Sequence, residues 1–474
     1  MARMNVPVAY PPPLNHEGIP AARISALAEL RRSVLSALLW ENTFYEKGSE
    51  HAKRVIDLVS VCKPEDVAAL AIEARDKMYL RHVPLFLVRQ LARTKGNGTL
   101  VAKTLAHVIQ RPDELGEYLA MYWGGVMTGN KKRPEPLSAG SVRGLAAAFK
   151  KFNEYSLAKY DRDTGVKLRD VLRLVHAKPS PGETYVTKDF SFKNPNQEHH
   201  VRRHLDGQGA LWAKVITREL ATPDTWETEL SAGKDKKATF ERLLRENKLG
   251  GLAFLRNLRN MVQANVDMGL IRERFAGDFN KVLPFRFLAA VNHAPSLASL
   301  LDAAMLRVTA EQPKLAGRTI VLVDISPSMH AALSGKSEMT REDAACGLAV
   351  LVREIAEHGR VFAFSNDVAE APAFRGLALV AGIKRAVPSN GTMLGAAVQA
   401  MNRLPHDRLI VITDEQSQDM VPAPTAARAY MINVASYQNG VGYGKGWTAH
   451  IDGWSDRVLD FIRTVEQEAE TVIP

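Results

Sequence analysis

The chain has 474 residues, of which 46% are hydrophobic and 24% charged, so it can form two to four globular domains with buried cores. No apolar run approaches the roughly 18–20 residues that span a bilayer, and the Pro-rich first 20 residues lack the apolar segment of a secretory signal. Cys62 and Cys346 are far apart in helix-like patterns, which argues against a disulfide framework or a cysteine metal site. We therefore expect a cytoplasmic protein with no membrane partner and an irregular lead-in over 1–20.

The net charge of +10 is unevenly distributed. Residues 313–474 hold 15 Lys and Arg against 18 Asp and Glu, which leaves 47 against 34, a net charge of +13, in residues 1–312. A positive excess of this size in one part of the chain favours a polyanionic partner, such as nucleic acid, over a basic surface that serves only solubility.

Residues 21–310 show one helical pattern after another, with apolar residues at i, i+3, i+4 and i+7 and breaks at Gly, Pro or charged residues. Clear examples are 24–40, 65–80, 140–160 and 295–308. The alternation in YVTKDFSF (185–192) fits a strand or a loop. Successive helical pairs of this kind are typical of an α-solenoid or a similar array of stacked helices.

After residues 311–318 the pattern changes to short β-branched runs that alternate with helical segments. The expected strands are 319–323, 360–364, 408–413 and 430–436, and the expected helices include 341–359 and 393–404. This alternation predicts a doubly wound α/β domain with a parallel sheet. We thus predict two domains, over 21–312 and 313–474.

An aspartate and two serines follow the first of these strands, as Asp324, Ser326 and Ser328. In a doubly wound sheet, ligands bind beyond the carboxyl ends of the strands. Thr392, in the loop SNGTML, and Asp414, after the strand RLIVIT, are placed to join the first three residues. Carboxylates and hydroxyls suit a divalent cation, most simply Mg²⁺; the alternative is a capped turn without metal. An aspartate-nucleophile phosphatase is excluded because a serine stands at position 326.

These five residues resemble the metal-ion-dependent adhesion site (MIDAS) of von Willebrand factor A domains, and the resemblance covers about 160 residues. It implies that all five ligate or orient the metal, with the last aspartate acting through water. A free coordination position would then suit a carboxylate from a partner protein. Met393, and not an acidic residue, follows Thr392, which predicts a weaker metal site.

Two basic stripes stand out in the helical part. In KLRDVLRLVHAKP, Arg169, Arg173 and His176 fall on one predicted helix face, opposite Leu168, Val171, Leu172 and Val175. In LAFLRNLRNM and the two residues after it, the polar stripe is Arg256, Arg259, Asn260 and Gln263, opposite Phe254, Leu258, Met261 and Val262. Cations one helical turn apart can meet successive phosphates. Lower-ranked basic groups are 131–133 and 200–204, and the alternative for each stripe is an ordinary solvated face.

The order of a basic helical part and an A domain resembles the Ro autoantigen family, which combines a TROVE domain with an A domain. The stretches that carry the resemblance are 157–179, 252–261, the DISPSM motif and 453–464, and they suggest a bacterial Ro protein. The resemblance implies a ring of HEAT-like repeats with a basic central hole. Single-stranded 3′ ends of misfolded or unprocessed RNAs enter that hole, and small structured (Y-like) RNAs bind outside it. It also points to Lys159, Arg162 and His176 as RNA contacts.

The sequence contains no phosphate loop, no nucleophile elbow and no reactive cysteine with an obvious partner. We therefore expect a non-enzymatic ribonucleoprotein component for RNA quality control or processing, monomeric, with a possible exoribonuclease partner and no DNA. The alternative is a protein–protein adaptor whose A-domain metal captures acidic ligands. An adaptor has no need of the charge concentrated in 1–312.

Overall fold

The structure is a computed structural model of the whole chain. It describes residues 14, 17–18, 25–35, 48–77, 80–124, 135–161, 165–178, 207–279, 282, 285–333, 339–435, 441, 446–452, 458–459, 462–463 and 466. The chain divides into two compact units. We call Ile56–Lys234 the helical unit, and Met1–Val55 with Asp235–Pro474 the α/β unit.

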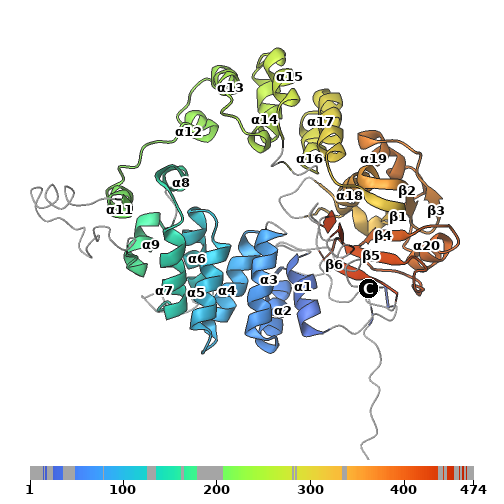
Figure 1. The fold of residues 1–474 in the computed structure, drawn as a ribbon, viewed down its shortest axis with the longest axis horizontal. Coiled ribbons are helices and arrows are strands. Elements are labelled where there is room, and N and C mark those ends of the chain that lie inside the picture. The colour runs from blue at the N-terminus through green and yellow to red at the C-terminus, as the bar shows by residue number, and fades with distance from the viewer. Residues whose placement is uncertain are drawn as a thin grey trace, which may run out of the picture. The chain divides into compact units, whose positions relative to one another are not determined.

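The helical unit consists of short helices that pack in succession (Figure 1). α3 packs on α4 and α5, α5 on α7, and α9 on α6, α7 and α11, so each helix meets its near neighbours in the sequence. This is the stacking predicted from the helical patterns. After α2 (Gly48–Val61), in which the division falls, the bounds are α3 (Pro64–Asp76), α4 (His82–Arg93), α5 (Gly98–Val108), α6 (Asp113–Trp123), α7 (Ala139–Phe149), α8 (Glu154–Tyr160), α9 (Leu168–Val175), α11 (Gly207–Thr217) and α12 (Trp226–Ser231).

One predicted helix is in fact two. The pattern over 140–160 predicts a single helix, but the structure breaks it into α7 and α8. Asn153 is in extended conformation and its side chain accepts a hydrogen bond from the Ser156 amide, which starts a new helix. The hydrophobic pattern continues across the break because both helices bury apolar residues, such as Phe149 and Leu157.

Six described helices of the α/β unit come before its first strand: α1 (Ala26–Leu35), α13 (Lys236–Arg245), α14 (Gly251–Gln263), α15 (Met268–Ala276), α16 (Phe285–His293) and α17 (Ala298–Ala310). From α13 onward they pack pairwise, α13 on α14 and α15, α14 on α16, and α15 and α16 on α17. No described helix is long and apolar enough to cross a membrane.

The sheet has six described strands in the order β3-β2-β1-β4-β5-β6. They are β1 (Leu315–Asp324), β2 (Ala356–Phe364), β3 (Val368–Glu370), β4 (Arg408–Thr413), β5 (Arg428–Asn433) and β6 (Ala449–Asp452). All neighbouring pairs are parallel except β2 with the edge strand β3. This confirms the predicted fold class of stacked helices followed by a doubly wound α/β part.

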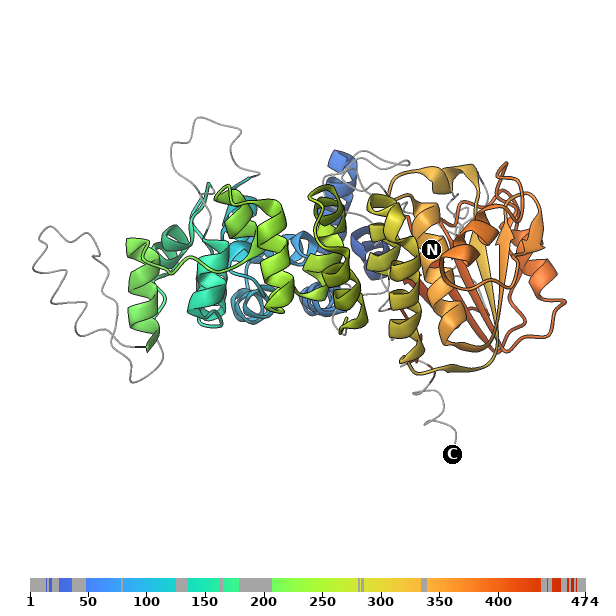
Figure 2. The same ribbon diagram turned by 90° about the horizontal axis from the view of Figure 1, so that it is seen from above.

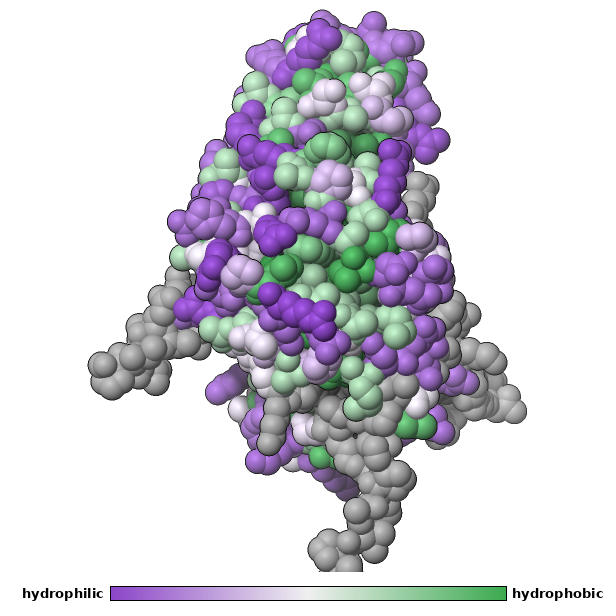
Figure 3. Space-filling view, turned by 90° about the vertical axis from the view of Figure 1, so that its right-hand side faces the viewer, coloured by the Kyte–Doolittle hydropathy of each residue, from purple (hydrophilic) through white to green (hydrophobic). Residues whose placement is uncertain are grey.

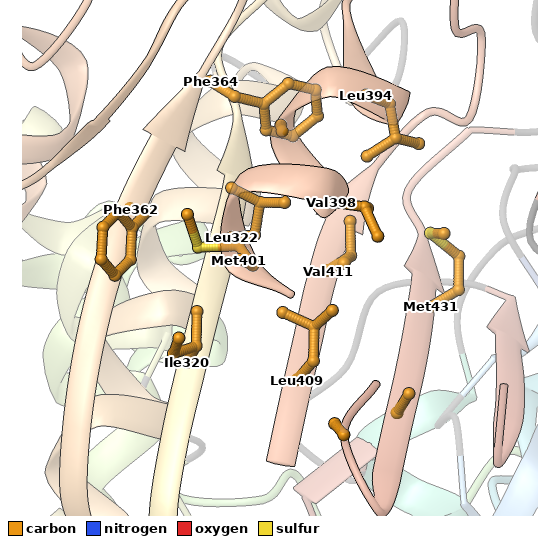
Figure 4. Close-up of a cluster of buried hydrophobic side chains, with 13 residues drawn as sticks. Ile320, Leu322, Phe362, Phe364, Leu394, Val398, Met401, Leu409, Val411 and Met431 are labelled. Carbon is orange, nitrogen blue, oxygen red and sulfur yellow. The ribbon is translucent and has the colours of Figure 1, made fainter. Parts of the chain in front are cut away.

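Helices cover both faces of the sheet (Figure 2). Ile320 and Leu322 of β1 pack with Leu394 and Val398 of α20 (Leu394–Met401) in a buried cluster (Figure 4). Because successive strand residues point to opposite faces, Val321 and Val323 face the other side, where α18 (Arg341–Ile355) packs on β1 and β2. The expected helix over 341–359 ends earlier, since Ala356 already belongs to β2.

The helices before the sheet are joined tightly to it. Asp302 of α17 accepts a hydrogen bond from the Leu377 amide at 2.9 Å, and so caps α19 (Gly376–Lys384). Gly376 has φ +56°, and a side chain there would collide with Asp302. Leu288 of α16 fills the space above Gly347 of α18, where a Cβ would lie 2.5 Å from Leu288 Cδ1. These helices and the sheet therefore pack as one unit.

Candidate metal site and cationic helix faces

The predicted metal ligands lie at the carboxyl edge of the sheet. Asp324 ends β1 and is completely buried. Its carboxylate accepts hydrogen bonds from the Ser326 amide at 2.8 Å and from the Thr413 hydroxyl, at the end of β4, at 2.6 Å. The Ser326 and Ser328 hydroxyl oxygens are 3.2 Å apart. Ligand oxygens at right angles around a Mg²⁺ ion, each 2.0–2.1 Å from it, are about 3 Å apart, so this spacing fits.

Asp414 brings a second fully buried carboxylate to this edge. Burial, together with the negative charge of Asp414, raises the pKa of Asp324 above its ordinary value. Arg341, itself 4% exposed, places Nη1 3.9 Å from Asp414 Oδ2 and supplies one positive charge. Two buried carboxylates with one nearby guanidinium are an unfavourable arrangement that a bound divalent cation would stabilise. The donor set therefore fits a hard dication.

Thr392 reaches the same edge through a loop fastened to β2. Ser365, the residue after β2, accepts hydrogen bonds from the amides of Asn390 and Gly391 at 2.9 and 3.1 Å and donates to the Gly391 carbonyl at 3.0 Å. The end of β2 pairs with Asp324, because Phe364 is its register partner. Gln418 joins Thr392 to the loop after Asp414 through a pair of hydrogen bonds, from the Thr392 amide at 3.3 Å and to the Thr392 carbonyl at 2.8 Å.

Sequence reasoning missed the residues that hold these ligands in place. Thr413 and Ser365 are polar residues directly after or at the end of a strand, and this position could have singled them out. Asp419 accepts from the amides of Gly395 and Ala396, both at 2.7 Å, and so fixes the start of α20 behind the Thr392 loop. Within the described residues, no group of three or more His, Cys, Asp and Glu gathers for a metal, so the candidate site depends on its hydroxyls.

Figure 3 shows one face of the molecule, with hydrophilic residues mainly along its two flanks and hydrophobic residues down its middle. Met420, one residue after the capping Asp419, is 67% exposed. Such isolated exposure is ordinary on a soluble protein surface.

The first basic stripe lies on α9 and just beyond it. Leu168, Val171, Leu172 and Val175 are buried, as predicted. Arg169 and Arg173 lie on the opposite face, but α9 ends at Val175, and His176 follows in the left-handed conformation with φ 46°. His176 is exposed but does not share the helix. The predicted i, i+4, i+7 row is therefore correct for the two arginines only.

The second stripe lies on α14. Arg256 and Arg259 are exposed, and Phe254, Leu258 and Met261 are buried. Val262, predicted to be buried, is 36% exposed, and Asn257 takes its place on the buried side, with its amide bonded to the Ala253 carbonyl at 2.9 Å. A mostly apolar face with one bonded amide is compatible with packing.

Lys159 lies on α8 at the edge of an open pocket within the helical unit, and its side chain is 27% exposed. Asp161 is also in the lining. Burial raises the pKa of the Asp161 carboxyl, and the neighbouring cations Arg218, Arg169 and Lys167 act against that rise. Positive charge therefore gathers around this carboxylate.

Some predictions concern residues outside the described part of the chain. These are Arg162, the basic groups 131–133 and 200–204, the strand-or-loop segment 185–192 and most of 453–464.

A family model and two known proteins are similar to parts of this chain in sequence. The TROVE domain model matches residues 216–333, which include Arg256, Arg259 and the DISPSM motif. Telomerase protein component 1 of Rattus norvegicus is 21% identical over 297 residues, covering 50% of this chain and 11% of that protein. Telomerase protein component 1 of Mus musculus is 32% identical over 107 residues, covering 21% of this chain and 4% of that protein. The chain thus matches about a tenth or less of the length of these relatives.

The crystal structure of the Deinococcus radiodurans RO (RSR) protein has the same fold, with a TM-score of 0.56 and 14% identity over 94% of this chain and 100% of that one. The chain matches the TROVE domain model over part of its length and shares the fold of a Ro protein, which confirms the resemblance to the Ro family seen in its sequence.

Proposed function

We propose that this chain is an RNA-binding protein of the Ro type that acts as a monomer in the cytoplasm. In this proposal it binds small structured, Y-like non-coding RNAs through its basic helices. It also takes up single-stranded 3′ ends of misfolded or unprocessed RNAs, for quality control or processing with a nuclease partner. The TROVE match and the Ro fold support RNA binding in general. The absence of a recognisable catalytic motif in the sequence favours a binding role over catalysis.

The observation that carries the proposal is the pairing state of the exposed arginines. Within the described residues, Arg173, Arg256 and Arg259 have no carboxylate partner. On the neighbouring helix α13, by contrast, Arg242 and Arg245 are paired with glutamates four residues away, at 2.7 and 3.0 Å. A guanidinium without an internal partner is available to phosphate, and its net charge attracts a polyanion.

The candidate metal site adds a second binding function to the proposal. Asp324, Ser326, Ser328, Thr392 and Asp414 would hold Mg²⁺, in keeping with their burial and oxygen chemistry. When bound, the ion would supply a Lewis-acidic position for a carboxylate of a protein partner. The residues of this chain orient the ligands: Thr413 and the Ser326 amide fix Asp324, and Ser365 fixes the Thr392 loop.

The test is equilibrium binding of the purified protein to a structured RNA with a single-stranded 3′ tail, compared with the same RNA with a blunt end. A salt series from about 50 to 200 mM measures the electrostatic part of the affinity. We expect tight, tail-dependent binding with a steep salt slope. Equal and weak binding to both RNAs would contradict the proposal and favour an adaptor that uses its metal site to bind acidic proteins.

Matched variants make the test specific. Arg256→Gln with Arg259→Gln should weaken binding and lower the salt slope by about 0.7–0.9 per lost phosphate contact. Arg242→Gln with Arg245→Gln removes the same charge from α13, where both arginines are already paired, and should change the slope less. If the two double variants behave alike, the pairing state of the arginines does not determine RNA binding.

A further inference from the structure

The helical unit contains an open pocket of about 1070 Å³, between the end of α8 with the residues after it and the segment from Arg218 to α12. This volume is slightly above the range of about 300–1,000 Å³ for small-ligand sites. One wall comes from Lys159, Asp161 and Lys167, and the other from Arg218 and the segment 220–231. All of these residues belong to the helical unit, so the pocket is complete within it.

The lining combines positive charge with an aromatic side chain. Three cations, Lys159, Lys167 and Arg218, outnumber the carboxylates Asp161 and Glu227. Lys159 Nζ is 3.9 Å from Glu227 Oε1, a loose pair. Arg218 also lies near Asp161, but among the described residues its guanidinium makes no ion pair, so its positive charge is available to an external anion.

Trp226, the first residue of α12, is partly exposed and lines the same pocket. The backbone at Trp226 is held in place, because the Thr225 hydroxyl caps α12 and the Thr228 hydroxyl donates to the Pro223 carbonyl at 2.6 Å. An indole held beside cations offers what an unpaired nucleotide needs: an aromatic surface for the base and positive charge for the phosphate. A base inside a double helix is already stacked and cannot enter.

We propose that this pocket seats one nucleotide of single-stranded RNA, with its base stacked on Trp226 and its phosphate held by Arg218. The proposal rests on the RNA-binding function proposed above and deepens it, since it names a subsite for an unpaired nucleotide. The stripes on α9 and α14 would bind phosphates without regard to strandedness, whereas this pocket selects an unstacked base.

The experiment uses the full-length protein and a series of tailed hairpin RNAs, each with one 4-thiouridine at a different tail position. Irradiation followed by mass spectrometry should give a cross-link to the peptide that contains Trp226 from one or two tail positions. Trp226→Ala should remove this cross-link and weaken binding of the tailed RNA roughly tenfold, without changing the salt slope, because stacking involves no counterion release. Arg218→Gln should lower the salt slope by about 0.7.

Two control variants distinguish a specific loss of RNA binding from a folding defect. Trp226→Phe keeps an aromatic ring and should recover most of the affinity. Tyr155→Ala removes an aromatic side chain that is 55% exposed on α8 but outside the pocket lining, and should leave both affinity and cross-link unchanged. If the wild type binds tailed RNA while Trp226→Ala binds equally well and no cross-link falls within 218–231, the pocket proposal is wrong and RNA binding stands. If the wild type binds neither RNA, both proposals fail.

Discussion

Replacing Ser365 with alanine should loosen the loop that carries Thr392. The Ser365 hydroxyl is completely buried, accepts from the amides of Asn390 and Gly391 at 2.9 and 3.1 Å, and donates at 3.0 Å to the Gly391 carbonyl. Alanine leaves two buried N–H donors without their acceptor, and each costs about 1–3 kcal/mol. We expect a total loss of about 2–4 kcal/mol, since water can reach part of the opened loop.

Hydrogen exchange followed by mass spectrometry is the appropriate assay, because it reports local opening in a chain of two units. The peptide that covers residues 389–394 should exchange on the order of 30-fold faster or more in Ser365→Ala. Thr425→Ala is the matched control: its hydroxyl bonds Asn402 at the exposed surface, and its loss should cost about 0.5 kcal/mol or less. If exchange of the 389–394 peptide is the same in both variants, Ser365 does not hold this loop.

Three other perturbations test the α/β unit. At a Mg²⁺ concentration 100 times Kd, the unfolding free energy of the wild type should rise by about 2.7 kcal/mol. A thermal melt of Asp324→Asn should show no such gain. An equal gain in both proteins would mean that Asp324 is not a metal ligand. Glu466→Ala leaves the buried Arg408 unpaired and should cost about 3–5 kcal/mol in a urea melt, whereas a loss below about 1 kcal/mol would show that the guanidinium finds water. Gly395→Ala places a Cβ 2.1 Å from the Met420 carbonyl oxygen, so it should lower the melting temperature. An unchanged melting temperature would mean that the 417–420 loop can move aside without loss of stability.

Hydrophobic periodicity predicted well where helices and strands lie in the sequence, but it predicted their first and last residues poorly. The strand expected at 408–413 is β4 residue for residue, because a fully buried run bounded by charged residues has few alternatives. The helix expected at 140–160 was divided, since one asparagine in extended conformation stops a helix without disturbing the hydrophobic pattern around it. Val262 was predicted to be buried but is partly exposed, because the sequence alone does not show which side of α14 meets α16.

For the candidate metal site, the types of the ligand residues and their positions after strands could be predicted from the sequence. The residues that hold those ligands in place by hydrogen bonds could not. Asp324 ends β1 and Asp414 follows β4, and these two strands pair in parallel, so topology brings both carboxylates to one edge. Ser365 and Asp419 act through hydrogen bonds to backbone amides 23 to 26 residues away in the chain, and no local pattern signals such a contact. The metal identity and the RNA-contact residues remain predictions.

The cap that Asp302 provides for α19 bears on how the protein can be divided for separate production. A fragment that begins at residue 313 would carry every described strand of the sheet. It would lose Asp302, the acceptor for the Leu377 amide, and it would expose the surface of α18 around Gly347, against which Leu288 packs. Cutting the chain near residue 235 instead would keep α13 to α17 with α18, α19 and the sheet, and residues 1–55, which belong to the same unit, would have to be supplied as well. The place where the sequence changes its pattern and the place where the protein can be cut are therefore some eighty residues apart.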